Sequence, residues 1–250
     1  MHIQDKVFVV TGAARGLGLA MAQAIAQQGG RLALLDLDQV AVTAAAKTCG
    51  NESRGYVCNV ADEASVEKAF ANIVADFGRL DGLINNAGLL RDGLLIKHKD
   101  GKLLDKMSLS QWQSVIDVNL TGTFLCGREA AAAMAQAGNG GIIINISSIA
   151  RAGNMGQTNY AASKAGVASM VSTWGRELAR FNIRTGGIAP GVIASDMTAS
   201  MQPEMLERLA KMVPVGRLGS PIEVAEVALF MIENDYFSGR LIELDGGLRM

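Results

Sequence analysis

Short apolar runs recur along this chain of 250 residues and alternate with longer segments of helical period. Within each run apolar side chains follow one another without polar interruption, which is the pattern of strands buried on both faces of a sheet. We expect six such strands, at residues 7–10, 32–35, 83–85, 142–146, 183–188 and 241–244. Helical stretches lie between them, at residues 17–28, 64–77, 111–135 and 160–181. This alternation predicts one α/β domain over residues 1–250, with a parallel sheet covered by helices on both faces.

Composition and charge exclude several other classes of protein. The chain is 49% hydrophobic and 19% charged, as globular proteins are, and its formal net charge is -1. No bulk electrostatic attraction to nucleic acid or to an anionic membrane is therefore expected. No apolar run approaches the roughly 18 residues of a membrane helix, and the first strand begins too early to leave room for a signal peptide.

The cysteines give no sign of a structural cross-link or a metal centre. Cys49, Cys58 and Cys126 are odd in number and show no paired spacing. This argues against a disulfide framework and against a zinc cluster, so we expect no metal and a cytoplasmic protein. Any binding partner has to be inferred from a specific site.

The turn after the first strand is rich in glycine. Gly12, Gly16 and Gly18 lie between that strand and an amphipathic helix, with Arg15 and Leu17 in the same turn. Glycine lets the backbone approach a pyrophosphate closely, and the helix N-terminus offers free N–H groups and the positive end of its dipole. An ordinary strand-to-helix turn also uses glycine, but the position of this one favours a dinucleotide site.

Asp36 ends the second predicted strand. A carboxylate there can accept both ribose hydroxyls of an adenosine and would repel a 2'-phosphate, which favours NAD over NADP. Arg15 acts in the opposite sense, because a guanidinium could pair with a 2'-phosphate. A helix N-cap is the structural alternative for Asp36.

Three further motifs join the glycine turn TGAARGLG: NNAG at 85–88, NISS at 145–148 and YAASK at 160–164. In this order the chain resembles the short-chain dehydrogenase/reductase (SDR) family over residues 6–247. Within the family, GNMGQTNYAASKAG and VGRLG are most similar to 3-oxoacyl-[acyl-carrier-protein] reductases. The resemblance implies a Rossmann-type doubly wound sheet, NAD or NADP as cofactor, and interconversion of a ketone and a secondary alcohol. It also implies a homotetramer, joined through the helices at 111–135 and 160–181 and through the C-terminal strand and tail.

By this resemblance Tyr160 is the proton donor in reduction and the base in oxidation. A phenol with an ordinary pKa of about 10 is a poor base at neutral pH and needs a nearby positive charge. Lys164 lies one helical turn later on the same face and can supply that charge, as can an oxidised nicotinamide. On spacing alone, the pair could equally belong to the amphipathic rim of an interface helix.

The serine that orients the substrate carbonyl is ambiguous. Counting back from Tyr160 at the usual family spacing selects Ser147, whereas the strand motif NISS selects Ser148. A loop absorbs a deletion more easily than a buried strand, so we favour Ser148. Asn119 resembles the fourth catalytic residue of the family, which holds a water beside Lys164; a purely structural hydrogen bond is its alternative.

The resemblance assigns further residues to the cofactor and the substrate. The additional cofactor positions are Asn59, Val60, Asn86, Ala87, Gly88, Pro190, Gly191, Ile193 and Ser195. Gly153 and Gln157 join Ser148 and Tyr160 in lining the substrate pocket. A lid is expected over about residues 194–213, where Met197, Met201, Met205 and Met212 could form an apolar wall or pack in a helix core.

Residues 95–107 form an insertion relative to the family and should emerge at the crevice side of the sheet. Lys97, Lys99, Lys102 and Lys106 could meet an anionic phosphopantetheine or coenzyme A arm, but a solvated loop is favoured. The uncharged stretch AGNGG at 137–141 argues against an acyl carrier protein partner.

These features predict an NAD-preferring oxidoreductase that acts on a 3-oxoacyl thioester or a related β-keto substrate. A dehydrogenase of a small diol, sugar or hydroxysteroid is the enzymatic alternative. A nucleotide-sensing protein without turnover is the alternative from another class, although a sensor has no need of Ser148, Tyr160, Lys164 and Asn119.

Overall fold

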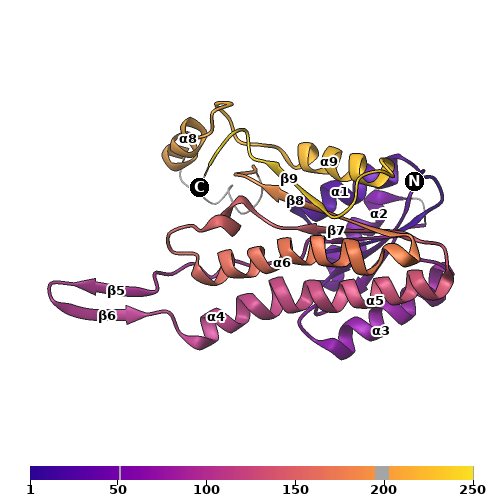
Figure 1. Cartoon of the computed structure of the whole chain (residues 1–250), viewed down its shortest axis with the longest axis horizontal. Coiled ribbons are helices and arrows are strands. Elements are labelled where there is room, and N and C mark those ends of the chain that lie inside the picture. Colours follow the sequence, from indigo (N-terminus) through magenta and orange to yellow (C-terminus); the bar gives the residue numbers. More distant parts are fainter. Residues whose placement is uncertain (51, 195–202, 250) are drawn as a thin grey trace.

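A seven-stranded sheet lies at the centre of the computed structural model, which describes residues 1–50, 52–194 and 203–249 (Figure 1). The strands are all parallel and follow the order β3-β2-β1-β4-β7-β8-β9. They are β1 (Val7–Thr11), β2 (Arg31–Asp36), β3 (Arg54–Val57), β4 (Gly82–Asn85), β7 (Gly141–Ile146), β8 (Ile183–Pro190) and β9 (Arg240–Leu244). The six expected strands are confirmed. The sequence pattern missed β3 because this edge strand is partly exposed and carries no continuous apolar run.

Helices cover both faces of the sheet (Figure 1). One layer holds α1 (Gly16–Gln27), α2 (Gln39–Cys49) and α9 (Pro221–Glu233); the other holds α3 (Glu63–Phe77), α4 (Leu109–Ile116), α5 (Gly122–Ala137) and α6 (Thr158–Glu177). Shorter elements are η1 (Asp117–Thr121), η2 (Ile149–Ala152), η3 (Ala179–Phe181) and α8 (Pro203–Met212). The predicted α/β architecture with a doubly wound sheet is therefore confirmed. None of the described helices has the length and apolar character needed to cross a bilayer.

Neighbouring residues of the central strands pack into different cores. Phe8 joins the cluster of α1, α2 and α9, whereas Val7 and Val9 join the cluster of α3 and α5. Successive side chains of a strand point to opposite faces, so both faces of the sheet are buried. This explains the uninterrupted apolar runs of the sequence, and each large side chain buried in this way contributes about 1.5–3 kcal/mol.

The strand order reverses between β1 and β4. From β1 the chain proceeds outward through β2 to β3, and from β4 it proceeds through β7 and β8 to β9 on the other side. In an open α/β sheet, a ligand crevice forms at such a switch point, outside the carboxyl ends of the strands. The segments that follow β1, β4 and β7 are therefore brought to one place.

The insertion is solvated, as the sequence favoured, but it is folded as a β-hairpin and is not an irregular loop. Strands β5 (Ile96–Lys99) and β6 (Lys102–Lys106) pair antiparallel between β4 and α4, and every residue of both strands is exposed. The hairpin projects from the body beyond α4 (Figure 1). Asp100 and Gly101 form its turn with φ values of 50° and 77°, as an Asp-Gly hairpin turn requires.

Candidate active site and cofactor cleft

The glycine turn joins β1 to α1 by a close approach of backbone to backbone. Gly12 has φ +61°, and a methyl group on Gly18 would lie 2.3 Å from the carbonyl oxygen of Gly12. Any side chain at either position would push the helix away from the turn. The turn is also fastened to β4, because the Asn86 amide nitrogen donates to the carbonyls of Thr11 and Gly12, at 3.0 Å each. Thr11 Oγ1 accepts in turn from the backbone N–H groups of Asn86 and Ala87.

The beginning of α1 carries no cap among the described residues. Arg15 is the N-cap but provides no side-chain hydrogen bond, and the first turn contains no acidic residue. A methyl group on Gly16 would meet no atom within 4 Å, so the space in front of this glycine is open. Uncapped N–H groups that face open space can hold a pyrophosphate, and the turn therefore fits a dinucleotide.

Asp36 is half-buried at the end of β2, with its carboxylate oriented by two backbone groups. Ala14 N–H donates to one oxygen at 3.1 Å, and Leu37 N–H donates to the other at 2.8 Å. The N-cap of the following helix is Asp38, which accepts from Val40 and Ala41. The N-cap alternative for Asp36 is therefore wrong, and each of its carboxylate oxygens retains acceptor capacity.

Tyr160 lies in the first turn of α6, and Ser148 is the second residue after the end of β7. The Ser148 side chain faces the Tyr160 hydroxyl, whereas the Ser147 hydroxyl donates to the carbonyl of Lys164 at 2.8 Å and fastens β7 to α6. Lys164 Nζ lies 5.7 Å from the centre of the Tyr160 ring. The structure thus brings Ser148, Tyr160 and Lys164 together, and it leaves Ser147 in the packing between strand and helix.

Burial acts on the pKa of both titratable groups. It raises the pKa of Tyr160, which the Ser148 hydrogen bond opposes and the negative charge of Asp92 reinforces. Burial also lowers the pKa of Lys164 to about 8, and its ammonium donates to the carbonyl of Ile146 at 2.7 Å. In this arrangement Tyr160 is held as a neutral phenol, the form that donates a proton.

Asn119 lies in η1, a single π-helical turn between α4 and α5. Its fully buried amide accepts from Leu89 N–H at 2.8 Å and donates to Leu89 carbonyl at 3.1 Å and to Ser163 Oγ at 3.3 Å. A methyl group on Gly88 would lie 3.3 Å from Asn119 Oδ1 and 3.6 Å from Lys164 Nζ. Asn119 therefore lies beside Lys164, and its amide also pairs with the backbone of Leu89, in the segment after β4.

The remaining cofactor positions surround the same edge. Asn59 is exposed and accepts from Ala61 N–H at 3.1 Å, while the Val60 side chain is buried against Gly122. Pro190 ends β8, Gly191 N–H donates to Leu244, and Ile193 pairs with Gly219 in an isolated β-bridge. Ser195 lies outside the described residues.

Part of the predicted substrate wall can be located. Met197 and Met201 of the expected lid lie outside the described residues, whereas Met205 and Met212 are exposed on α8. Gly153 is exposed with φ +116°, and a methyl group there would meet no atom within 4 Å. Open space at this glycine suits a pocket lining.

Comparison with known proteins agrees with the family that the sequence motifs indicate. A family model described as Enoyl-(Acyl carrier protein) reductase matches residues 12–249. A 3-oxoacyl-[acyl-carrier-protein] reductase FabG of Thermotoga maritima is 39% identical, with 99% of each chain covered. The chain belongs to the short-chain dehydrogenase/reductase family. Similar relatives include FabG of Escherichia coli K12, 34% identical over 100% of both chains, and a (3R)-3-hydroxyacyl-CoA dehydrogenase of Rattus norvegicus, 36% identical over 100% of this chain and 98% of the relative.

As a member of the SDR family, the chain is an NAD(P)-dependent oxidoreductase that acts on CH–OH and keto groups. Among residues 1–50, 52–194 and 203–249, no three His, Cys, Asp or Glu side chains gather into a group that could hold a metal ion.

Sequence reasoning missed a set of polar side chains around the start of α6 in this SDR. Gln111 Nε2 donates to the carbonyls of Arg91 and Asp92, at 3.1 and 3.2 Å, and the Asn159 amide donates to Arg91 carbonyl at 3.0 Å. Gln157, which the sequence did select, donates to the Asp92 carboxylate at 3.0 Å. We call Asp92, Gln111, Gln157 and Asn159 the clamp. Its members come from three separate segments of the chain. The one indication in the sequence is that Gln157 and Asn159 lie close to Tyr160 along the chain.

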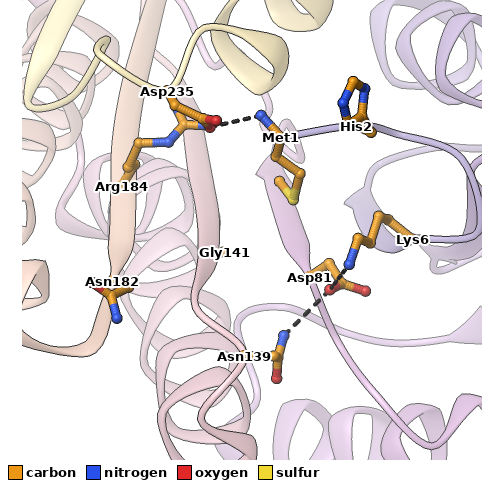
Figure 2. Close-up of a pocket in the computed structure, with 9 residues that line it drawn as sticks. All are labelled: Met1, His2, Lys6, Asp81, Asn139, Gly141, Asn182, Arg184 and Asp235. Carbon is orange, nitrogen blue, oxygen red and sulfur yellow. Dashed lines mark hydrogen bonds and ion pairs between the residues drawn. The ribbon is translucent and has the colours of Figure 1, made fainter.

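A hollow of about 390 Å³ lies far from the SDR site, at the amino ends of the strands. It is lined by Met1, His2, Lys6, Asp81, Asn139, Gly141, Asn182, Arg184 and Asp235 (Figure 2). Its charged groups are paired with one another: the Met1 amine lies 2.6 Å from Asp235, and Lys6 Nζ lies 3.7 Å from Asp81 (Figure 2). These pairs tie the N-terminus to the sheet, and the hollow is unconnected with the catalytic edge.

Proposed function

We propose that this SDR reduces the ketone of 3-oxoacyl thioesters, with NADH as the preferred hydride donor. The observation that carries the proposal is the meeting of Ser148, Tyr160 and Lys164 beside the uncapped start of α1. The names of similar relatives support the substrate class, since two are 3-oxoacyl-[acyl-carrier-protein] reductases and one is a (3R)-3-hydroxyacyl-CoA dehydrogenase.

In the proposed reaction, Tyr160 gives its proton to the carbonyl oxygen of the substrate while Ser148 donates a hydrogen bond to the same oxygen. When bound, the nicotinamide supplies the hydride. Burial supports the direction of reduction, because the raised pKa of Tyr160 keeps the phenol protonated at neutral pH. Lys164, with a pKa of about 8, is largely charged at pH 7 and stabilises the phenolate that proton transfer leaves behind.

Each part of the cofactor has proposed partners along the crevice. The N–H groups of Gly16, Leu17 and Gly18 hold the pyrophosphate, with Gly12 and Arg15 at its edge, and Asp36 binds the adenosine ribose. The proposed adenine and ribose contacts are Asn59, Val60, Asn86, Ala87 and Gly88. The proposed nicotinamide contacts are Pro190, Gly191, Ile193 and Ser195, together with Tyr160 and Lys164.

The preference for NADH rests on charge at the ribose end. Asp36 and Asp38 both lie there, and the sequence has no lysine or arginine from residue 32 to 46. A 2'-phosphate would meet these carboxylates, and the exposed Arg15 of the glycine turn is the cation that could offset them. In wild-type enzyme we expect a higher kcat/KM with NADH than with NADPH, and Asp36→Ala should narrow the difference. A wild-type preference for NADPH would show that Arg15 dominates.

The test of the catalytic role is NADH oxidation with acetoacetyl-CoA. Tyr160→Phe removes the proton donor while preserving the ring, so we expect kcat to fall by about 10²–10⁴-fold. Tight binding of NADH by the variant would show that its fold is intact. Turnover by the variant at the wild-type rate would contradict the mechanism, and oxidation of a diol, sugar or hydroxysteroid in place of thioester reduction would favour the alternative substrate class.

We also propose a cytoplasmic homotetramer joined through α5, α6 and the end of the chain. Phe124 is 42% exposed on α5, and β9 lies at the edge of the sheet with one side free for pairing. The three buried cysteines are free, as in proteins of a reducing compartment. Light scattering of the purified enzyme gives the number of subunits.

A further inference from the structure

Asp92 lies at the entrance to the site, in the segment between β4 and the hairpin. Its carboxylate accepts from Gln157 Nε2 at 3.0 Å, and Gln157 is the N-cap of the catalytic helix α6. The backbones of the two segments also pair, since Gly93 N–H donates to Gly156 carbonyl at 2.8 Å and Gly93 and Gln157 form a parallel bridge. Asp92 is therefore held next to the turn of helix that carries Tyr160.

The backbone of Asp92 is fixed from two sides by the clamp. Gln111 Nε2 donates to the carbonyls of Arg91 and Asp92, and the buried Asn159 amide donates to Arg91. A carboxylate accepts hydrogen bonds only, so it holds the nitrogen end of the Gln157 amide toward itself. Asn154 donates to the oxygen end of the same amide at 2.9 Å.

The charge of Asp92 is not neutralised by its surroundings. The residue is exposed, and among the described residues it forms no ion pair. Burial is the main cause of the raised pKa of Tyr160, and the negative charge of Asp92 adds to it; no other carboxylate in the described part of the chain has this effect. Lys164, the cation of the site, is buried on the inner side of the tyrosine.

We propose that Asp92 is a specificity-determining residue that excludes free 3-oxo acids and thereby selects neutral acyl thioesters. The inference rests on the proposed function. During reduction the ketone oxygen has to lie at the Tyr160 hydroxyl, and in a 3-oxo acid the carboxylate is only two carbons away from that ketone. It would enter the field that Asp92 exerts at Tyr160, whereas the thioester carbonyl at the same position carries no charge.

Steric fit does not produce this selection, because the acid and the thioester share the same 3-oxoacyl group. An effect of Asp92 on Tyr160 alone would change both substrates equally and would cancel in the ratio of their kcat/KM values. The ratio therefore reports the repulsion between the two carboxylates and not the general efficiency of the enzyme.

The experiment measures kcat/KM with NADH for acetoacetate and for the neutral thioester S-acetoacetyl-N-acetylcysteamine. Asp92→Asn keeps an oxygen that can accept from Gln157 and removes the charge, so the ratio of acid to thioester should rise about tenfold, mainly through a lower KM for the acid. Asp92→Glu keeps the charge and should keep the discrimination. In wild-type enzyme, added salt should also raise the ratio by screening this exposed charge.

Asp105→Asn is the matched control, because it removes the same charge from the exposed hairpin. The ratio should stay at the wild-type value in this variant. Suppose that the enzyme reduces the thioester but the ratio is unchanged in Asp92→Asn, or changes equally in Asp105→Asn. Either result would overturn the role of Asp92 and leave the proposed function standing. A wild-type enzyme that reduces neither compound would overturn the proposed function itself.

Discussion

Residues 86–93 and the hairpin that follows them both leave the sheet after β4, yet different interactions determine their conformations. Residues 86–93 are held by hydrogen bonds with β1, α4 and the start of α6. The hairpin that follows is held by its own cross-strand pairing, and its apolar side chains Ile96, Leu103 and Leu104 are all more than half exposed. Residues 86–93 are thus positioned by groups distant along the chain, whereas the hairpin takes its shape from its own residues.

The difference has an energetic consequence. Groups buried in the catalytic region are costly to change, because removal of one partner leaves another buried polar group without its hydrogen bond. A two-stranded hairpin in water is marginal by itself and contributes little to the rest of the fold. Mutations on the two sides of this comparison should therefore differ in size.

The largest effect is expected at Lys164, the buried charge beside the clamp. Lys164→Met should lower kcat for acetoacetyl-CoA reduction by about a hundredfold or more, since the phenolate of Tyr160 loses its neighbouring cation. The same change should raise the free energy of unfolding at pH 7 by about 1–3 kcal/mol, because burial of the ammonium lowers its pKa to about 8. Activity assays and urea unfolding measure the two effects. A less stable variant would contradict this energetic account.

The pH dependence of stability provides the control for Lys164. The folded-state pKa of about 8 lies below the ordinary value of 10.5, so between these two pH values the unfolded chain binds more protons than the folded one. Stability from this group therefore rises with pH through that interval and is lowest below about pH 8. The rise should be absent in Lys164→Met.

A smaller effect is expected within the clamp itself. Asn159→Ala removes the amide that donates to Arg91 and Gln111 and accepts from Tyr160 N–H. Buried polar groups then lose a partner, and unfolding should become easier by about 1–3 kcal/mol, with a lower kcat as Tyr160 loses its support. Urea unfolding and steady-state kinetics measure both changes. Wild-type stability in Asn159→Ala would show that the clamp is not needed to hold this segment.

The smallest effect is expected from removal of the hairpin. Replacement of residues 96–106 by two glycines deletes side chains that are all exposed, so the free energy of unfolding should change by no more than about 0.5 kcal/mol. Thermal and urea unfolding at several protein concentrations measure this. If the free energy of unfolding fell by more than it does in Asn159→Ala, the hairpin would contribute more to stability than the clamp does. Contact of the hairpin with another molecule would then be the explanation.

The sequence predicted those elements whose conformation depends on residues that are neighbours along the chain. The apolar runs predicted six strands, and the glycine turn and Asp36 were located at the ends of β1 and β2 as expected. Strand β3 and helices α2 and α9 were not predicted. Strand β3 lacks an apolar run, and α2 and α9 lie outside the four stretches in which helical periodicity was recognised. The hairpin was also missed, although Asp100 and Gly101 are a local turn signal.

By itself, the sequence determined the α/β class, the glycine turn after β1 and the pairing of Tyr160 with Lys164, because each depends on residues that are close along the chain. Only the tertiary structure decided that Ser148 faces Tyr160 while Ser147 bonds to Lys164 carbonyl, and that Asp92 lies at the entrance to the site. These outcomes depend on how β7, α4 and α6 pack against one another. A hydrogen bond between segments many residues apart leaves no periodicity in either of them, so spacing alone could not predict it.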